Sequence, residues 1–298
     1  MTASPPAPAA TVEVVGDVRA RLGEGPVWDD RAAALYWVDI RAPALHRYEP
    51  ASGAVRTWPM PEAIGSVALR EPAGLLVALR SGLHLFDPDT GAFDRIPGTG
   101  PLSPSIRYND GRCDPGGRFW VGSMHARGRE PVGALYCLAP GRRWRRVRDG
   151  LTVPNGLGWS PDGRTMYFTD TPTRTILAFP ADPESGALGP ARVFAVVPED
   201  AGYPDGATID AEGGLWSAHW DGWRITRYAP DGRVDRVVWL PVQRPTSCAF
   251  GGSALDVLFI TSARAGLGDE ALRKGPLAGA VLAARPGVRG RPEPRVRD

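Results

Sequence analysis

The sequence predicts an all-β protein, a six-bladed β-propeller built from four-stranded blades. Its apolar runs are short, rich in Val, Leu, Trp, Tyr and Phe, and closed by turn residues, as in ALYWVDI at 34–40 and TMYFTD at 165–170. Runs of this kind are typical of β-strands. No segment shows a sustained 3.6-residue apolar period, and GDEALRK at 268–274 suits a single helical turn.

The strands fall into repeats, which is the observation that predicts a propeller. The repeated units start near Glu24, Ser66, Asn109, Asn155, Asp205 and Thr246, and successive starts lie 41 to 50 residues apart. Propeller blades repeat at roughly 40–50 residues. Each unit reads as a strand, a turn, an aromatic strand, a third strand and, in most units, a fourth edge strand. Residues 12–21 precede the first unit, so we expect them to supply an outer strand to the last blade and close the ring.

Length and composition set the domain organisation and exclude several partners. We expect a disordered tail at 1–11, a propeller at 12–290 and a C-terminal tail at 291–298. The chain has 298 residues, 43% of them hydrophobic, and a net charge of +2. This near balance predicts no nucleic-acid partner. No apolar run approaches the roughly 20 residues that span a bilayer, so no membrane partner is expected.

The N-terminus and the cysteines indicate a cellular compartment. The opening MTASPPAPAATVEV lacks the basic segment and apolar stretch of a signal peptide. Three scattered cysteines, Cys113, Cys137 and Cys248, offer neither a disulfide framework nor a Cys-x-x-Cys metal knuckle. We therefore expect a cytoplasmic protein that is a monomer or a weak homo-oligomer.

Polar residues open all six units. The innermost strand of each propeller blade lines the central channel, so these openers are expected at one mouth of it. Glu24, Asn155 and Asp205 stand in the same register, and each is followed by Gly. Two carboxylates and an amide without His or Cys suit Ca²⁺, Mg²⁺ or Mn²⁺, while Zn²⁺ or Fe²⁺ is a less typical occupant. Solvent exposure at a loop, or an ion that merely ties the blades together, are the competing interpretations.

Five segments together carry a resemblance to a known family. They are LGEGPVWD at 22–29, RYNDGRCDPGGRFWVGSM at 107–124, VPNGLGWSPDGRTMYFTDT at 153–171, YPDGATIDAEGGLWSAHWDG at 203–222 and RPTSCAFGG at 244–252. In order and spacing the chain resembles the SMP-30/gluconolactonase/regucalcin-like family of six-bladed propeller lactonases, from about residue 24 to 289.

The resemblance implies a site and a reaction. Glu24, Asn155 and Asp205 would bind one divalent ion, and Asp205 would also be the general base. Arg107 and Asn109 would hold the hydroxyls or carbonyl of a sugar lactone. In this mechanism the metal polarises the lactone carbonyl, Asp205 takes a proton as water attacks, and the ring oxygen leaves to give the aldonic acid.

One departure bears on the substrate. Some relatives place a substrate-contacting Glu two residues after the methionine of the GSM segment, where this chain has Ala126. His125, beside it, is our candidate substrate contact. The substrate pocket is therefore expected to differ from that of those relatives.

Three functions are compatible with these residues. The first is a divalent-metal-dependent hydrolase that opens a γ- or δ-aldonolactone, a small-molecule partner. The second is a calcium-binding regulatory or scaffold propeller without turnover, which does not require Arg107 and Asn109 to face the metal. The third is a metal-dependent esterase or phosphotriesterase, which would use the same ion and base.

Overall fold

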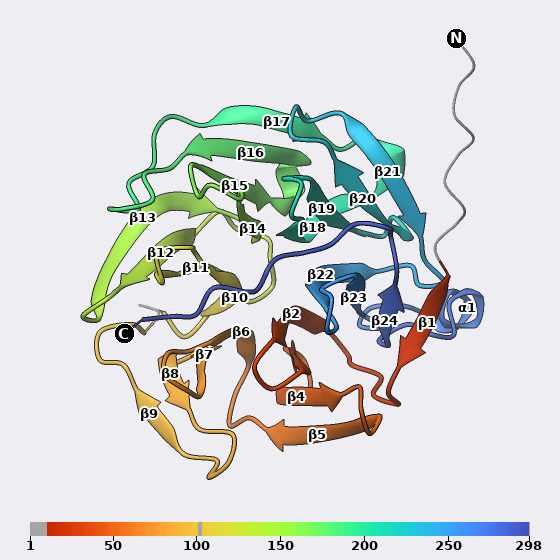
Figure 1. Ribbon diagram of the computed structural model, residues 1–298, viewed down its shortest axis with the longest axis horizontal. Coiled ribbons are helices and arrows are strands. Elements are labelled where there is room, and N and C mark those ends of the chain that lie inside the picture. Colours follow the sequence, from red (N-terminus) through yellow and green to blue (C-terminus); the bar gives the residue numbers. More distant parts are fainter. Residues whose placement is uncertain (1–10, 101–102, 298) are drawn as a thin grey trace.

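The computed structural model describes residues 11–100 and 103–297, and within these ranges six four-stranded antiparallel sheets form a ring (Figure 1). The predicted six-bladed propeller is confirmed. Blade 1 contains β2 (Gly23–Asp29), β3 (Ala34–Asp39), β4 (Ala44–Glu49) and β5 (Ala54–Pro59); blade 2 contains β6 (Ile64–Leu69), β7 (Leu75–Leu79), β8 (Gly82–Phe86) and β9 (Phe93–Arg95). Blade 3 contains β10 (Ile106–Cys113), β11 (Phe119–His125), β12 (Gly133–Ala139) and β13 (Arg143–Leu151).

The other three blades follow the same order, with one exception in the last. Blade 4 contains β14 (Pro154–Trp159), β15 (Thr165–Asp170), β16 (Thr175–Pro180) and β17 (Arg192–Val196); blade 5 contains β18 (Tyr203–Ile209), β19 (Leu215–Trp220), β20 (Arg224–Tyr228) and β21 (Val234–Trp239). Blade 6 contains β22 (Pro245–Gly251), β23 (Val257–Ser262), β24 (Val281–Ala284) and, as its outer strand, β1 (Val12–Val15). The pairing of Val12 with Ala284 confirms that the first strand closes the ring.

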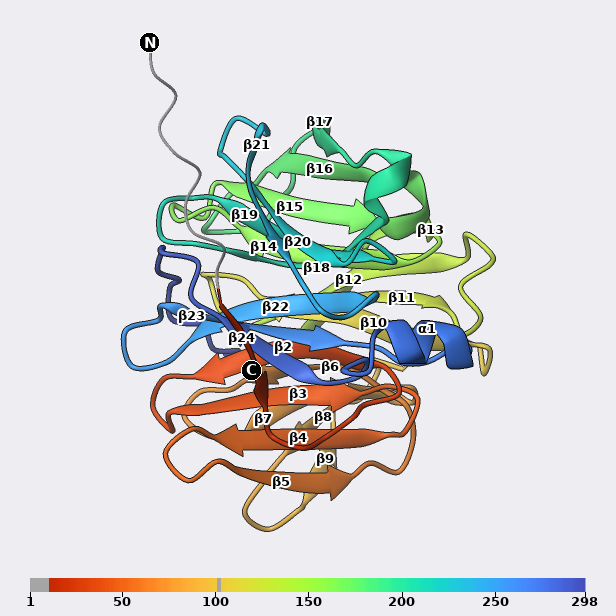
Figure 2. The ribbon, with the colours of Figure 1, turned by 90° about the vertical axis from the view of Figure 1, so that its right-hand side faces the viewer.

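Apolar side chains from neighbouring blades fill the space between the sheets. The aromatic second strands supply the largest of them, and Trp37, Trp120 and Trp216 are fully buried. Each such burial contributes roughly 1.5–3 kcal/mol. Viewed from the side, the strands run between the two faces of the ring (Figure 2). Short helices join some of the strands: η1 (Thr171–Thr173), η2 (Glu199–Ala201) and α1 (Asp269–Lys274), the last at the predicted helical turn. In the described ranges no helix is long and apolar enough to cross a bilayer.

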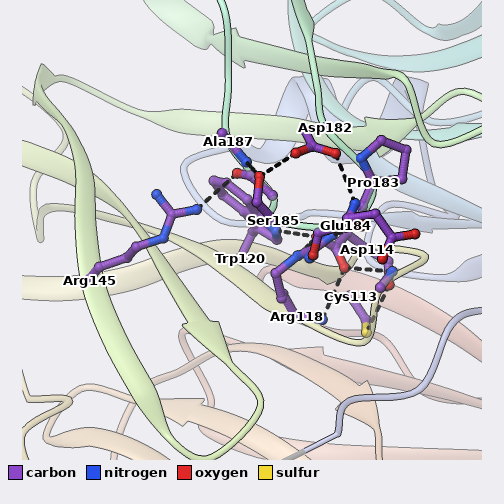
Figure 3. Close-up of polar contacts among 12 residues, drawn as sticks. Cys113, Asp114, Arg118, Trp120, Arg145, Asp182, Pro183, Glu184, Ser185 and Ala187 are labelled. Atoms are coloured by element: carbon purple, nitrogen blue, oxygen red, sulfur yellow. Dashed lines mark hydrogen bonds and ion pairs between the residues drawn. The ribbon is translucent and has the colours of Figure 1, made fainter.

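A buried carboxylate fixes the β10–β11 turn and ties blade 3 to blade 4 (Figure 3). Asp114 accepts hydrogen bonds from the Arg118 Nε at 2.6 Å and the Trp120 indole at 2.9 Å. The same guanidinium donates to the carbonyls of Pro183 and Glu184, in the β16–β17 loop of blade 4. Blade 5 repeats the device, with Asp210 accepting from Trp216 and Arg227. These turns lie at the opposite ends of the inner strands from the predicted site.

Residues 285–297, which we call the strap, cross the face that holds these turns. Figure 1 shows the segment as the dark blue trace running over the centre of the ring. Val296 is fully buried and bridges Arg70 of blade 2 in parallel fashion, and Arg295 pairs with Asp29 of blade 1 at 2.6 Å. The segment predicted as a tail at 291–298 thus includes residues packed across the ring. The tail predicted at 1–11 falls almost entirely outside the described residues.

Candidate active site

Backbone bulges present the predicted site residues at the channel. The pairing of each of four inner strands with its neighbour shifts register there: after Glu24 in β2, Tyr108 in β10, Asn155 in β14 and Pro204 in β18. Bulges of this kind bend a strand and redirect its side chains. The Gly after Glu24 and the Gly after Asn155 follow from this geometry. Gly25 and Gly156 have φ of 51° and 62°, a region that other residues rarely adopt.

A continuous series of hydrogen bonds links five residues across three blades. Arg107 Nη1 donates to Asn109 Oδ1 at 2.7 Å, and Asn109 Nδ2 donates to Asn155 Oδ1 at 2.9 Å. Asn155 Nδ2 then donates to Thr171 Oγ1 at 2.8 Å, and that hydroxyl donates to the Pro204 carbonyl at 2.9 Å. The series ends next to Asp205. Arg107, Asn109, Asn155 and the backbone before Asp205 are therefore held in one arrangement.

Thr171 takes part in this series of hydrogen bonds, and it was not among the site residues predicted from the sequence. Its position at the end of the second strand of blade 4, just beyond the VPNGLGW hairpin, was the available signal. The residue orients the Asn155 amide by accepting from its nitrogen. The Asn155 oxygen accepts from Asn109 and retains a second lone pair.

Two buried carboxylates share this end of the channel. Glu24 and Asp205 are 8% and 5% exposed. Burial raises the pKa of Glu24 well above its usual value, and the negative charges of Asp205 and Asp110 raise it further. Burial likewise raises the pKa of Asp205, with a further contribution from Asp110. The two carboxylates therefore lie close enough to repel each other.

Arg107 compensates this negative charge only in part. Its cation opposes the pKa increase of both carboxylates, while burial lowers the pKa of Arg107 itself to about 10. Its guanidinium donates hydrogen bonds to the Tyr108 carbonyl and to Asn109 Oδ1. In the described part of the chain it makes no ion pair with Glu24 or Asp205. A cation placed between the carboxylates would remove the remaining repulsion.

The donor set fits a hard divalent ion. Two repelling carboxylates and a fixed amide oxygen match the oxygen ligands that Ca²⁺, Mg²⁺ and Mn²⁺ prefer. Over the described ranges, no group of three or more His, Cys, Asp or Glu side chains is arranged to hold a metal ion. The predicted set differs from such groups because its third member is the Asn155 amide.

Asp110 lies in the channel between the site and the strap. Its Oδ2 accepts from the Leu157 backbone N–H at 3.2 Å, across the boundary to blade 4. Burial raises the pKa of Asp110, and the nearby Arg112 cation opposes that increase. Asp110 thus holds the backbone of the bulge that follows Asn155 in the neighbouring blade.

His125 lines a cavity that the other predicted site residues do not line. It pairs with Ile106 at the end of the β10–β11 ladder and lines a cavity of about 340 Å³ with Ser105, Ser123 and Arg146. None of Glu24, Arg107, Asn109, Asn155 or Asp205 lines that cavity. Among the described residues, His125 Nδ1 has no hydrogen-bond partner although it is closed off from solvent. Its role as a substrate contact stays a prediction.

An aromatic side chain is fixed at the end of β19. The Arg244 guanidinium lies 4.6 Å from the centroid of Trp220 and pairs with Asp221 at 2.6 Å. Asp221 and Trp223 both have positive φ, near 59° and 56°, on either side of Gly222. Strain of this kind persists where surrounding contacts impose it. The ends of β19 and β18 pair directly, since Tyr203 lies opposite Trp220, so this ring stands close to the Asp205 bulge.

A known protein family matches most of the chain. The model of the SMP-30/Gluconolactonase/LRE-like region matches residues 22–264. The chain belongs to the SMP-30/gluconolactonase/LRE-like family. The resemblance predicted from the sequence is therefore confirmed.

Members of this family with related sequences are named for sugar lactones. A 6-deoxy-6-sulfogluconolactonase of Pseudomonas putida is 40% identical over 92% of this chain and 94% of that protein. An L-arabinolactonase of Azospirillum brasilense is 42% identical over 93% of each. The solved structure of a calcium-binding protein, regucalcin, from Agrobacterium tumefaciens has a TM-score of 0.92 at 31% identity and covers 98% of both chains.

Proposed function

We propose that this protein is a divalent-metal-dependent sugar lactonase that opens a γ- or δ-aldonolactone to the aldonic acid. The observation that carries the proposal is the series of hydrogen bonds from Arg107 through Asn109 to Asn155, beside the carboxylates of Glu24 and Asp205. A scaffold propeller has no need for a cation and an amide aligned with its ion site. The names of the related lactonases support the same reaction class.

Glu24, Asn155 and Asp205 would hold the ion. A divalent ion bound there supplies Lewis acidity toward the lactone carbonyl. Arg107 and Asn109 orient the substrate, because Asn109 fixes the guanidinium and leaves its remaining N–H groups for lactone oxygens. Pre-positioned donors of this kind need little reorganisation during the reaction.

Asp205 acts as the general base. The water oxygen bonds to the carbonyl carbon while the Asp205 carboxylate accepts a water proton. The bond from that carbon to the ring oxygen then breaks, and the proton passes to the ring oxygen, so one water is added overall. A carboxylate positioned to take a proton from the attacking water supplies general base catalysis.

Substitution of Asp205 tests this assignment. We expect Asp205→Asn to lower kcat by about 10²–10⁴-fold, the usual contribution of a positioned base. Asp256→Asn, at a 41%-exposed carboxylate paired with Arg285, is the matched control and should leave kcat unchanged. Full activity of Asp205→Asn with the ion still bound would exclude Asp205 as the base.

A panel of lactones with each divalent ion identifies the substrate. Acid release from five- and six-carbon aldonolactones, with and without a 6-sulfo group, separates the preferences that the two related lactonases are named for. Chelation should abolish turnover, and one added ion should restore it. Ion binding without turnover on any lactone would instead favour a protein that only binds calcium; the related regucalcin is described as a calcium-binding protein. The cytoplasmic location and the oligomeric state stay predictions.

A further inference from the structure

The strap reaches into the channel beneath the proposed site. Glu293 Oε1 lies 3.3 Å from Arg112 Nη2, and the two side chains are 10% and 14% exposed. Asp110, Arg112 and Glu293 line one small space of about 10 Å³ in the channel, with Ser247 on the opposite side. A space of this size holds about one water. The strap residue, the arginine and the aspartate therefore lie around the same small space in the channel.

Arg112 and Asp110 each hydrogen-bond to the backbone of a strand that carries a proposed metal ligand. Arg112 Nη1 donates to the Ala207 carbonyl at 2.8 Å, two residues after Asp205 in β18. Asp110 accepts from Leu157 N–H at 3.2 Å, two residues after Asn155 in β14. Side chains of blade 3 thus hydrogen-bond to the bulged backbone that follows each of these two ligands.

Glu293 decides where Arg112 points. A guanidinium has a planar, rigid fork of donors, so an acceptor on one branch fixes the direction of the other. Here one branch donates to Ala207 and the other meets Glu293. Without Glu293, Arg112 would keep one acceptor among the described residues, the Ala207 carbonyl, and the side chain would gain freedom to rotate away from it.

We propose that Glu293 is a positioning residue for the metal site, acting from the opposite face of the ring through Arg112. The inference rests on the proposed metal-dependent function. In this arrangement the strap residue directs Arg112 onto the Ala207 carbonyl, in the backbone behind Asp205. Glu293 touches neither the ion nor the substrate, so its effect is transmitted entirely through Arg112.

Direct titration of the metal-free protein with Ca²⁺ and with Mn²⁺ tests the proposal without relying on turnover. Partners that orient metal ligands typically change metal affinity by 10–100-fold, so we expect Glu293→Gln to weaken binding of the ion by about tenfold. We also expect kcat on the best lactone to fall with little change in KM. Glu293→Gln keeps the size of the side chain, and thermal unfolding of the metal-free protein reports whether it remains folded.

Two further variants isolate the route through Arg112. In the Arg112→Gln background, Glu293→Gln should add almost nothing, because the two residues act as one unit. Asp256→Asn removes the partner of Arg285, an exposed strap ion pair away from the channel, and should leave ion affinity unchanged.

Three outcomes would overturn the proposal. A lower unfolding temperature in Glu293→Gln with unchanged ion affinity and kcat would make Glu293 a stability residue only. Additive losses in the double variant would exclude transmission through Arg112. A wild-type protein that binds no ion would overturn both this inference and the proposed function, whereas normal wild-type binding and turnover with an unaffected Glu293→Gln variant would overturn this inference alone.

Discussion

Replacing Asn109 by alanine removes the central link of the site. Its amide accepts from Arg107 at 2.7 Å and donates to Asn155 at 2.9 Å and to the Pro154 carbonyl at 3.0 Å. Asn109 is 5% exposed, so its partners are left largely without replacements. Two neutral hydrogen bonds at ~1 kcal/mol each and one to a charged group at ~1.5–3 kcal/mol give a loss of about 3 to 5 kcal/mol in unfolding free energy.

The same change should lower kcat/KM by about 100-fold or more, because Arg107 and Asn155 both lose their orientation. Urea unfolding and lactone hydrolysis measured on the same preparation provide the two numbers. Thr99→Val is the matched control, since Thr99 is fully buried in blade 2 and makes two hydrogen bonds, to Leu83 and Ile96. It should lose stability but keep kcat/KM. An Asn109→Ala variant with the behaviour of Thr99→Val would refute the positioning argument.

Three further predictions follow from the described contacts. Glu24→Gln should stabilise the metal-free protein by about 1–2 kcal/mol, because it removes one of two repelling buried carboxylates. The same change should abolish ion-dependent turnover. A lower free energy of unfolding in urea would contradict the repulsion. Burial lowers the pKa of His219 to about 4, below its unfolded value of about 6.5, so protons favour the unfolded chain and stability falls as pH drops through this window. Between pH 7 and 5 this amounts to about 2 kcal/mol, and a His219→Gln variant with the same pH slope as wild type in urea unfolding would exclude the assignment. Asp114→Asn should lower unfolding free energy by about 3 kcal/mol, because Arg118 keeps its buried charge without a carboxylate, while an altered ion affinity would show that the β10–β11 turn also shapes the site.

The repeat pattern predicted the fold and the register of the site residues because both are local properties of each blade. The units that begin at Glu24, Asn155 and Asp205 each start with a polar residue followed by Gly. In the structure a β-bulge lies at each of these positions. The hydrogen-bond chain through Thr171 was beyond reach, since it joins side chains to the backbone of a different blade.

The strap was predicted as a tail for a related reason. Residues 291–297 have no counterpart in the repeats, and their polar, Pro-containing sequence lacks an apolar pattern. Their burial depends on partners far away in the chain, such as Arg112 for Glu293 and Asp29 for Arg295. Contacts of this range leave no periodic signal. The neighbours of His125 were likewise set by blade packing, which a single strand register does not reveal.

The closure of blade 6 has a consequence for how the protein is made. Val12 pairs with Ala284, so the two strands that seal the ring lie at opposite ends of the propeller sequence and leave the ribosome far apart in time. During synthesis β1 has no partner until β24 emerges, and its unpaired backbone stays available to other chains. Closing so long a loop also places this pairing among the slowest steps of folding. Blades 1 to 5 have their strands complete before that point, and the ring closes only after β24 has been synthesised.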